Sequence, residues 1–396
     1  MNRSIFEDQL EALLSEPMGA VLRREQSTFD EQTTPFEKSL VLFGAGGLGR
    51  KTLAGLRRLG IEPLAFADNN PSLWGKDING VQVLSLQNAV KKFGQSAAFV
   101  ITIWKGESTD RMSERRQQLL NPNCPKVIPF SYLYWKYPEV FLPHYAFDMP
   151  HKVYQQADEV RKVLSLWADA ASQHEYLAQL RWRMLMDFDN LPSPVSHEIY
   201  FPNDLVNILP DDVFVDCGAY DGDTIRNFLH IQGDSFKKII AFEPDPANFE
   251  KLQQFALTLP TNIRNRLILH QLATGTRKGK AHFEATGTEA SAIGSGDFEV
   301  DCISLDEILT NDRPMYIKMD IEGSEVDTLI GAQNIIRKEL PVLAICAYHR
   351  QDHVWRIPSL ISSFSDQYRF FLRPHLLEVW DLVCYAIPVN RLNIKL

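Results

Sequence analysis

The sequence predicts an α/β protein in which two doubly wound domains are joined by a helical linker. Two stretches carry this prediction, residues 39–68 and residues 213–243, and both show the same succession of patterns. Each begins with a buried strand, continues through a glycine-bearing turn and a helix, and ends with a second strand and an acidic residue. Between them, residues 151–188 place apolar side chains at helical spacing. At 396 residues the chain is long enough for two or three domains.

The later stretch opens with a strand at residues 213–215 and turns into an acidic, glycine-bearing loop. The loop residues that we expect to surround a ligand are Asp216, Gly218, Tyr220, Asp221 and Gly222. A helix is expected to follow, with Asp223 or Thr224 as its N-cap. A glycine turn between a strand and a helix is the place where open α/β sheets bind nucleotides.

The charge of this loop indicates the kind of ligand. The diphosphate of a dinucleotide binds at a helix N-terminus, which favours a loop without carboxylates. Here Asp216, Asp221 and Asp223 would repel a diphosphate. S-adenosylmethionine has no phosphate, and its α-amino group and its sulfonium are both cationic. An acidic glycine loop therefore favours S-adenosylmethionine as the cofactor.

The next strand supports this cofactor. Residues 238–242 form a predicted strand that ends at Glu243, about 20 residues after Gly222. An acidic residue in that place can accept hydrogen bonds from both ribose hydroxyls, and Pro244 then turns the chain toward the next helix. The end of a third strand, at Ala273, is where the adenine ring would lie. The alternative is that these acids are only helix caps.

Four motifs make this half of the chain resemble the FkbM methyltransferases, which are class I enzymes that use S-adenosylmethionine. The motifs are Asp216-Cys-Gly-Ala-Tyr-Asp-Gly222, Ala241-Phe-Glu-Pro-Asp245, Ser304-Leu-Asp-Glu-Ile-Leu309 and Tyr316-Ile-Lys-Met-Asp-Ile-Glu-Gly-Ser-Glu325, the last continued by Leu329-Ile-Gly-Ala332. The last motif is the most specific, because Lys-x-Asp-x-Glu-Gly-x-Glu is unusual outside this family. One departure is Tyr220, where the family usually has asparagine.

The resemblance covers about residues 200–390 and has consequences for fold and chemistry. It implies a class I methyltransferase fold with a mixed seven-stranded sheet that ends on an antiparallel strand. It also implies transfer of a methyl group to an oxygen, with a small molecule or a glycan as the acceptor. The glycine- and serine-rich connector 287–296 is a candidate lid over that acceptor.

Two residues at the ends of predicted strands are candidates for catalysis. Asp320 follows a strand at residues 314–319, where its carboxylate could contact the cofactor, hold the acceptor or take its proton. His349 follows a strand at residues 342–347 and is a candidate general base, because its unperturbed pKa lies near neutral pH. A structural, hydrogen-bonded histidine is the alternative. His353 lies one helical turn further on, but no third ligand is identifiable, so no metal is predicted.

The earlier stretch carries a second glycine turn, which is typical of dinucleotide-binding, Rossmann-like domains. Its residues are Gly44, Gly46, Gly47 and Gly49, followed by Asp68 at the end of the second strand. This turn has no carboxylate and precedes Arg50 and Lys51, which suits a phosphate. With Asp68-Asn-Asn-Pro71 it resembles the small nucleotide-binding domains at the front of bacterial sugar-modifying enzymes. The resemblance implies a nucleotide or a nucleotide-sugar rather than redox chemistry. NAD(P), which the dinucleotide-type turn itself suggests, and a scaffold that has lost its ligand are the alternatives.

These patterns predict four segments. Residues 1–36 form N-terminal helices and a polar linker from residue 26, residues 37–150 form the nucleotide-binding domain, residues 151–199 form a helical bridge, and residues 200–396 form the methyltransferase domain. The N-terminal helices are expected to pack on a neighbouring domain or on a second copy of the chain, as in a homo-oligomer. The aromatic stretch 129–150 is expected to form a seam between domains. The alternative function is an NAD-dependent oxidoreductase or a nucleotide-sugar-binding protein that uses the first glycine turn, although no catalytic residues for an oxidoreductase accompany that turn.

Composition excludes several other classes of protein. A net charge of −9 argues against a nucleic-acid partner bound through a basic surface. No apolar run approaches the length of about 18 residues that a membrane span needs, and no secretory signal is visible. The five cysteines are scattered and form no CxxC pair, which favours a reducing compartment. A cytoplasmic location is therefore expected.

Overall fold

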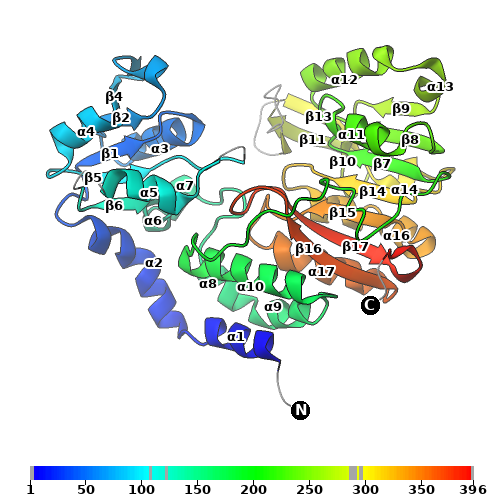
Figure 1. Cartoon of the computed structure of the whole chain (residues 1–396), viewed down its shortest axis with the longest axis horizontal. Helices are drawn as coiled ribbons and strands as arrows, with labels where there is room; N and C mark the ends of the chain where they lie inside the picture. Colours follow the sequence, from blue (N-terminus) through cyan, green and yellow to red (C-terminus); the bar gives the residue numbers. More distant parts are fainter. Residues whose placement is uncertain (1–3, 107–108, 121–123, 285–291, 294–297, 394–396) are drawn as a thin grey trace. The chain divides into compact units, whose positions relative to one another are not determined.

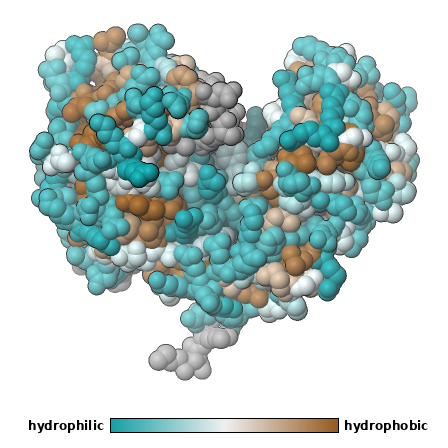
Figure 2. Space-filling model, turned by 180° about the vertical axis from the view of Figure 1, so that it is seen from behind, coloured by the Kyte–Doolittle hydropathy of each residue, from teal (hydrophilic) through white to brown (hydrophobic). Residues whose placement is uncertain are grey.

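The computed structural model describes residues 4–106, 109–120, 124–284, 292–293 and 298–393. The chain divides into two compact units (Figure 1). Unit 1 comprises residues 1–157, 177–193 and 376–380, and unit 2 comprises residues 158–176, 194–375 and 381–396. On the face drawn in Figure 2, hydrophilic residues are widespread and hydrophobic ones form scattered patches. Among the helices described, none is long and apolar enough to cross a membrane.

Unit 1 is built on a six-stranded sheet whose order is β3-β4-β2-β1-β5-β6. All neighbouring strands run parallel except β3, which is antiparallel to β4. The bounds are β1 Leu40–Phe43, β2 Ala65–Asp68, β3 Asp77–Ile78, β4 Val81–Ser85, β5 Ala98–Ile101 and β6 Val127–Pro129, with helices α3 Gly47–Arg58, α4 Leu86–Phe93 and α5 Met112–Leu120. From β1 the chain forms β2 and β4 toward one edge of the sheet, and it then returns to form β5 and β6 toward the other edge. This reversal next to β1 confirms the doubly wound, Rossmann-like fold.

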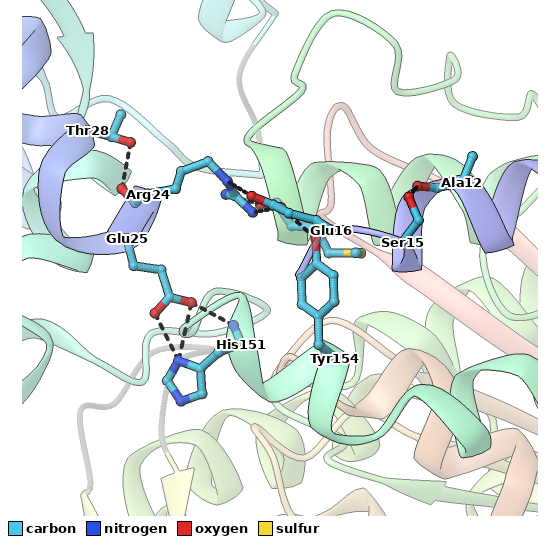
Figure 3. Close-up of polar contacts among 9 residues, drawn as sticks. Ala12, Ser15, Glu16, Arg24, Glu25, Thr28, His151 and Tyr154 are labelled. Atoms are coloured by element: carbon cyan, nitrogen blue, oxygen red, sulfur yellow. Dashed lines mark hydrogen bonds and ion pairs between the residues drawn. The ribbon is translucent and has the colours of Figure 1, made fainter. Parts of the chain in front are cut away.

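Two helices precede this sheet, α1 Ile5–Leu14 and α2 Met18–Thr33. The polar linker expected from residue 26 is therefore wrong as far as Thr33, because α2 continues through it. The cause is a buried stripe with a spacing of four residues, which polar neighbours obscure in the sequence: Val21, Glu25, Phe29 and Thr33. Polar contacts then fix the helices within unit 1 (Figure 3), including Arg24 to Glu16 at 2.6 Å and His151 Nδ1 to Glu25 Oε2 at 2.9 Å.

The aromatic stretch forms two short helices, α6 Phe130–Lys136 and α7 Pro138–Phe141. Tyr134 and Trp135 are fully buried in unit 1. The rings of Tyr134 and Phe141 stack with their centroids 4.3 Å apart. These side chains therefore contribute to the core of the first unit.

Within the predicted helical bridge the structure has three helices, namely α8 His151–Gln155, α9 Ala157–Leu164 and α10 Ala170–Leu185. Its residues belong to both units, because residues 158–176 group with unit 2 while residues 177–193 group with unit 1. Within unit 2, Arg373 on β16 (Tyr368–Pro374) forms an ion pair with Asp169, in the segment between α9 and α10, at 2.6 Å.

Unit 2 contains a seven-stranded sheet whose order is β16-β17-β15-β14-β7-β8-β9. β17 is antiparallel to both of its neighbours, and the other neighbouring strands are parallel, as expected for a class I methyltransferase. The strands are β7 Val213–Cys217, β8 Lys238–Phe242, β9 Leu267–His270, β14 Tyr316–Met319, β15 Val342–Cys346, β16 Tyr368–Pro374 and β17 Leu382–Pro388. The helices are α11 Asp223–Gln232, α12 Pro246–Thr258, α13 Thr261–Arg264, α14 Leu305–Ile308, α15 Glu325–Ile330, α16 Gln333–Glu339 and α17 His353–Phe364.

A smaller four-stranded sheet has the order β10-β13-β11-β12. Its strands are β10 Ala273–Thr274, β11 Gly279–Glu284, β12 Ala292–Ile293 and β13 Phe298–Ile303. Most of the connector that we consider a candidate lid, residues 287–291 and 294–296, lies outside the described residues.

Candidate active site

The acidic loop begins where β7 ends and is shaped by glycine. Gly218 has a φ of +85°, and a Cβ added there would lie 1.9 Å from the backbone oxygen of Asp320. Only glycine therefore allows the loop after β7 to approach the end of β14 so closely. Gly222, with a φ of +90°, is the N-cap of α11, so the expected cap at Asp223 or Thr224 is wrong. Its left-handed conformation turns the chain directly into the helix.

Glu243 lies at the end of β8, beside this loop, and is 5% exposed. Its Oε2 accepts a hydrogen bond from the backbone N–H of Tyr220 at 2.8 Å, and its Oε1 accepts one from Asp245 at 2.9 Å. Burial raises the pKa of Glu243 to about 7, although both backbone donors oppose the shift. A carboxylate oxygen has two lone pairs, so each oxygen can accept a further bond from a hydroxyl.

Asp216 and Lys318 form a buried ion pair beneath the loop, with 3.0 Å between Oδ1 and Nζ. Lys318 also donates to the backbone oxygen of Gly218 at 2.7 Å, so it fixes the loop to β14. Burial raises the pKa of Asp216 to about 6, although the charge of Lys318 opposes the shift. The contact of Asp216 with a cofactor stays a prediction, because its side chain is fully buried.

Asp320 lies at the carboxyl end of β14 and its side chain is 25% exposed. Its Oδ2 accepts a hydrogen bond from the hydroxyl of Tyr200 at 2.7 Å, and its Oδ1 lies 3.2 Å from Nε2 of His349. Burial alone would raise the pKa of Asp320, but the hydrogen bond with His349 and the charge of Lys318 outweigh it and lower the pKa to about 2. The group is therefore a carboxylate at neutral pH.

His349 is surrounded by carboxylates from the chain that follows β14. Its Nδ1 lies 2.7 Å from Oε1 of Glu325, and its Nε2 lies 3.6 Å from Oε1 of Glu322. Burial would lower the pKa of His349, but the charges of Glu325 and Glu322 raise it well above its ordinary value. His353 lies 3.2 Å from the other oxygen of Glu325. Asp320, Glu325 and His349 each offer one possible metal-ligand atom, and these atoms lie within 4.8 Å of one another.

The structure brings several predicted residues together and leaves others apart. Asp320 and His349 meet directly, and the backbone of Tyr220 meets Glu243. The side chain of Asp221 instead pairs with Arg226 on α11. Pro244 is half-buried beside Glu243, and Ala273 is buried in β10, where it pairs with β13.

Sequence analysis missed part of this cluster. Glu322 and Glu325 were visible in the acidic motif after β14, but only the fold shows that they converge on one imidazole. Lys318, which belongs to the same motif, pairs with Asp216 on the neighbouring strand. Tyr200 had no local signal, because it lies 120 residues from Asp320 in the chain.

The glycine turn of unit 1 has a similar construction. Gly44 has a φ of +117°, and a Cβ on Gly49 would lie 1.9 Å from the backbone oxygen of Gly44. Asp68 accepts backbone hydrogen bonds from Ala45 and Asn70, both at 2.8 Å. Gly46 is the N-cap of α3, and Gly47 is the first residue of that helix. The acid at the end of the second strand thus braces the turn, and ligand binding by unit 1 stays a prediction.

Comparison with known proteins agrees with this architecture. The sequence model of the methyltransferase FkbM domain matches residues 216–376. The crystal structure of methyltransferase FkbM from Methylobacillus flagellatus KT superposes with a TM-score of 0.76 at 22% identity, covering 96% of this chain and 98% of that one. This likeness extends the shared fold to both units.

Two other structures superpose only weakly. A proposed rRNA methylase from Clostridium thermocellum gives a TM-score of 0.32 at 9% identity, covering 49% of this chain and 98% of that one. The Methanococcus jannaschii fibrillarin pre-rRNA processing protein gives 0.29 at 13% identity, covering 48% of this chain and 72% of that one. Among curated proteins, none matches the chain.

Proposed function

We propose that this chain, in which residues 216–376 form an FkbM methyltransferase domain, transfers a methyl group from S-adenosylmethionine to a hydroxyl oxygen. The observation that carries the proposal is the placement of Glu243 against the acidic glycine loop. The two lie at the ends of the neighbouring parallel strands β7 and β8. In open α/β sheets, ligands bind outside the carboxyl ends of such strands.

In this proposal the loop and Glu243 hold the cofactor. The Glu243 carboxylate accepts hydrogen bonds from the ribose hydroxyls while it remains bonded to the backbone of Tyr220 and Asp245. Gly218 and Gly222 keep side chains out of the loop, and Pro244 and Ala273 lie on the side of the adenine ring. The carboxylate of Asp320 faces the cationic end of the cofactor, and Asp221 adds negative charge to the loop although it pairs with Arg226, while Asp216 holds the loop from below.

Methyl transfer depends more on aligning the acceptor oxygen with the methyl group than on activating either of them, because the sulfonium is already a good leaving group. The acceptor oxygen attacks the sulfonium methyl in line, the carbon–sulfur bond breaks as the carbon–oxygen bond forms, and S-adenosylhomocysteine and a proton are released. Holding the two reactants in line can supply about 7–11 kcal/mol of the barrier. A general base can add a factor of about 10²–10⁴.

Asp320 is the better placed of the two catalytic candidates. Its side chain is 25% exposed, whereas that of His349 is 1% exposed, so the carboxylate is the group that an acceptor can reach. Both ring nitrogens of His349 face carboxylates. We therefore assign the contact with the acceptor hydroxyl to Asp320 and a positioning role to His349.

The acceptor that we propose is a carbohydrate-like molecule, because the glycine turn of unit 1 suits a nucleotide or a nucleotide-sugar. That turn has no acidic residue in the first turn of α3, and it is braced by Asp68. An NAD-dependent oxidoreductase is the second candidate, and the same turn favours it. An oxidoreductase activity would leave the site residues of unit 2 without a role, so we prefer the methyltransferase. We propose that it acts in the cytoplasm.

The test is a transfer assay with S-adenosylmethionine that carries a deuterated methyl group. The protein is incubated with pools of free sugars, nucleotide-sugars and other small alcohols, and the products are identified by mass spectrometry. The expected result is a labelled methyl ether and an equal amount of S-adenosylhomocysteine. Label on nitrogen or carbon would refute the oxygen acceptor, and reduction of NAD without methyl transfer would favour the oxidoreductase.

A further inference from the structure

We infer that Asp320, Glu322 and His349 form a binding site for one divalent metal ion, with Glu325 holding the imidazole from behind. The site combines two carboxylates and one imidazole at the carboxyl end of β14 and the end of β15. Of these residues, only Asp320 also has a role in the cofactor assignment. The role of the ion in catalysis rests on the proposed methyl transfer, but its binding does not.

The spacing of the donor atoms fits a single ion. Two ligands that each lie about 2.1 Å from a metal are separated by about 3.0 Å at octahedral angles and about 3.4 Å at tetrahedral angles. The Nε2 of His349 lies 3.2 Å from Oδ1 of Asp320 and 3.6 Å from Oε1 of Glu322. The first separation lies between these two values and the second is about 0.2 Å longer than the tetrahedral one, so each carboxylate lies near the spacing expected of a second ligand beside His349.

The other side of the imidazole has the arrangement that metal-bound histidines usually have. Such a histidine donates its second ring nitrogen to a carboxylate, which fixes the orientation of the ring. Here Nδ1 of His349 lies 2.7 Å from Oε1 of Glu325, and Glu325 is fully buried. The backbone N–H of Ile321 also donates to that oxygen at 3.0 Å. The ring is thus held with Nε2 turned toward Asp320 and Glu322.

Charge and access support the same site. Three carboxylates converge on one imidazole, so negative charge exceeds positive charge in this cluster even when the imidazole is protonated, and a divalent cation would offset the excess. The side chains of Asp320 and Glu322 are 25% and 15% exposed, whereas those of His349 and Glu325 are 1% and 0% exposed. An ion can therefore enter from the side of Asp320 and Glu322.

A ligand set of carboxylates and imidazole suits Mn²⁺, Fe²⁺ or Zn²⁺. The three protein ligands would leave positions open for an oxygen of the acceptor. An ion in that position would lower the pKa of a bound hydroxyl and orient it. The acceptor could then lose its proton although His349 is enclosed by carboxylates.

The test is titration of the chelator-treated, full-length protein with Mn²⁺, in which electron paramagnetic resonance measures the free ion. The expected result is one saturable site per chain. Glu322→Gln and His349→Ala should weaken it at least tenfold. Asp352→Asn is the matched control, because Asp352 lies close in the sequence but pairs with Arg356. Circular dichroism reports folding, and Glu322→Gln, at a partly exposed position, provides a milder change if His349→Ala does not fold.

The absence of a saturable site, or unchanged Mn²⁺ affinity in Glu322→Gln, would overturn the inference. The measurement is independent of turnover. If Mn²⁺ binds as expected and no methyl acceptor is found, the metal site stands and the proposed function fails. If methyl transfer occurs in protein that binds no Mn²⁺, the proposed function stands and the metal site fails.

Discussion

Glu243 is the single residue on which the cofactor assignment most depends. The residue is 5% exposed, and both of its carboxylate oxygens accept hydrogen bonds from backbone N–H groups. This carboxylate holds the loop, and in the proposed complex its remaining lone pairs accept hydrogen bonds from the ribose. Sequence spacing predicted the ribose contact, but only the structure shows the bonds to the loop.

We predict that the affinity for S-adenosylhomocysteine falls as pH falls through about 7. Burial raises the pKa of Glu243 to about 7 in the free protein, and the ribose hydroxyls bind best to the ionised form. Below pH 7 the carboxylate must lose a proton to bind, so the dissociation constant should be about tenfold higher at pH 6 than at pH 8. Glu243→Gln should bind more weakly and without this dependence. A wild-type affinity that does not change between these pH values would argue against the ribose contact.

For catalysis, we predict that turnover depends on the charge of Asp320. Asp320→Asn keeps the shape of the side chain and removes its charge, so turnover should fall by about 10²–10⁴-fold. The readout is the initial rate of methyl transfer to an acceptor found by screening, with Asp352→Asn as the control. Full activity in Asp320→Asn would remove Asp320 from the mechanism.

At the scale of single elements, the loop between β7 and α11 depends on glycine at one crowded point. A Cβ on Gly218 would lie 1.9 Å from the backbone oxygen of Asp320, and the φ of +85° is unfavourable for any L side chain. The loop and the end of β14 therefore cannot both keep their places if this residue gains a side chain.

We predict that Gly218→Ala lowers the free energy of unfolding by about 2–5 kcal/mol, from the strained backbone and the clash together. Gly279→Ala is the control, because a Cβ there meets nothing within 4 Å. Urea denaturation of the two variants measures the difference. Equal midpoints would show that the loop can move aside and that its geometry is less constrained than we infer.

The elements also show where sequence patterns suffice and where they fail. Strands β7, β8 and β14 were predictable because apolar runs end at glycine or acidic turns. The second half of α2 was missed because its buried stripe includes Glu25 and Thr33, which a hydrophobic pattern does not count. Contacts between distant segments, such as Tyr200 with Asp320, leave no periodic pattern in the sequence, so only the structure shows which residues surround Asp320.

At the scale of the whole molecule, the chain repeats one construction in two units. In each, a glycine turn after the first strand is braced by the acid that ends the next strand, Asp68 in unit 1 and Glu243 in unit 2. The two turns differ in charge: the first has Arg50 and Lys51 nearby, and the second has Asp221 and Asp223. This difference is the reason to expect a phosphate-bearing ligand in unit 1 and a cationic cofactor in unit 2.

The overall charge leads to a further prediction. With a net charge of −9, the protein should bind neither duplex DNA nor RNA oligonucleotides at 150 mM salt more tightly than about 10⁻⁴ M. Fluorescence anisotropy with labelled oligonucleotides checks this. Micromolar binding that weakens steeply with salt would reveal a local basic site and reopen nucleic acid as a substrate.

The central claim, a site for S-adenosylmethionine in unit 2, is tested most directly by calorimetric titration of the purified protein with S-adenosylhomocysteine. We predict one site per chain with a micromolar dissociation constant, and at least tenfold weaker binding in Glu243→Ala. Separate titrations with NAD and a UDP-sugar address unit 1. No heat with S-adenosylhomocysteine, together with clear binding of NAD, would contradict the account and move the function to the first unit.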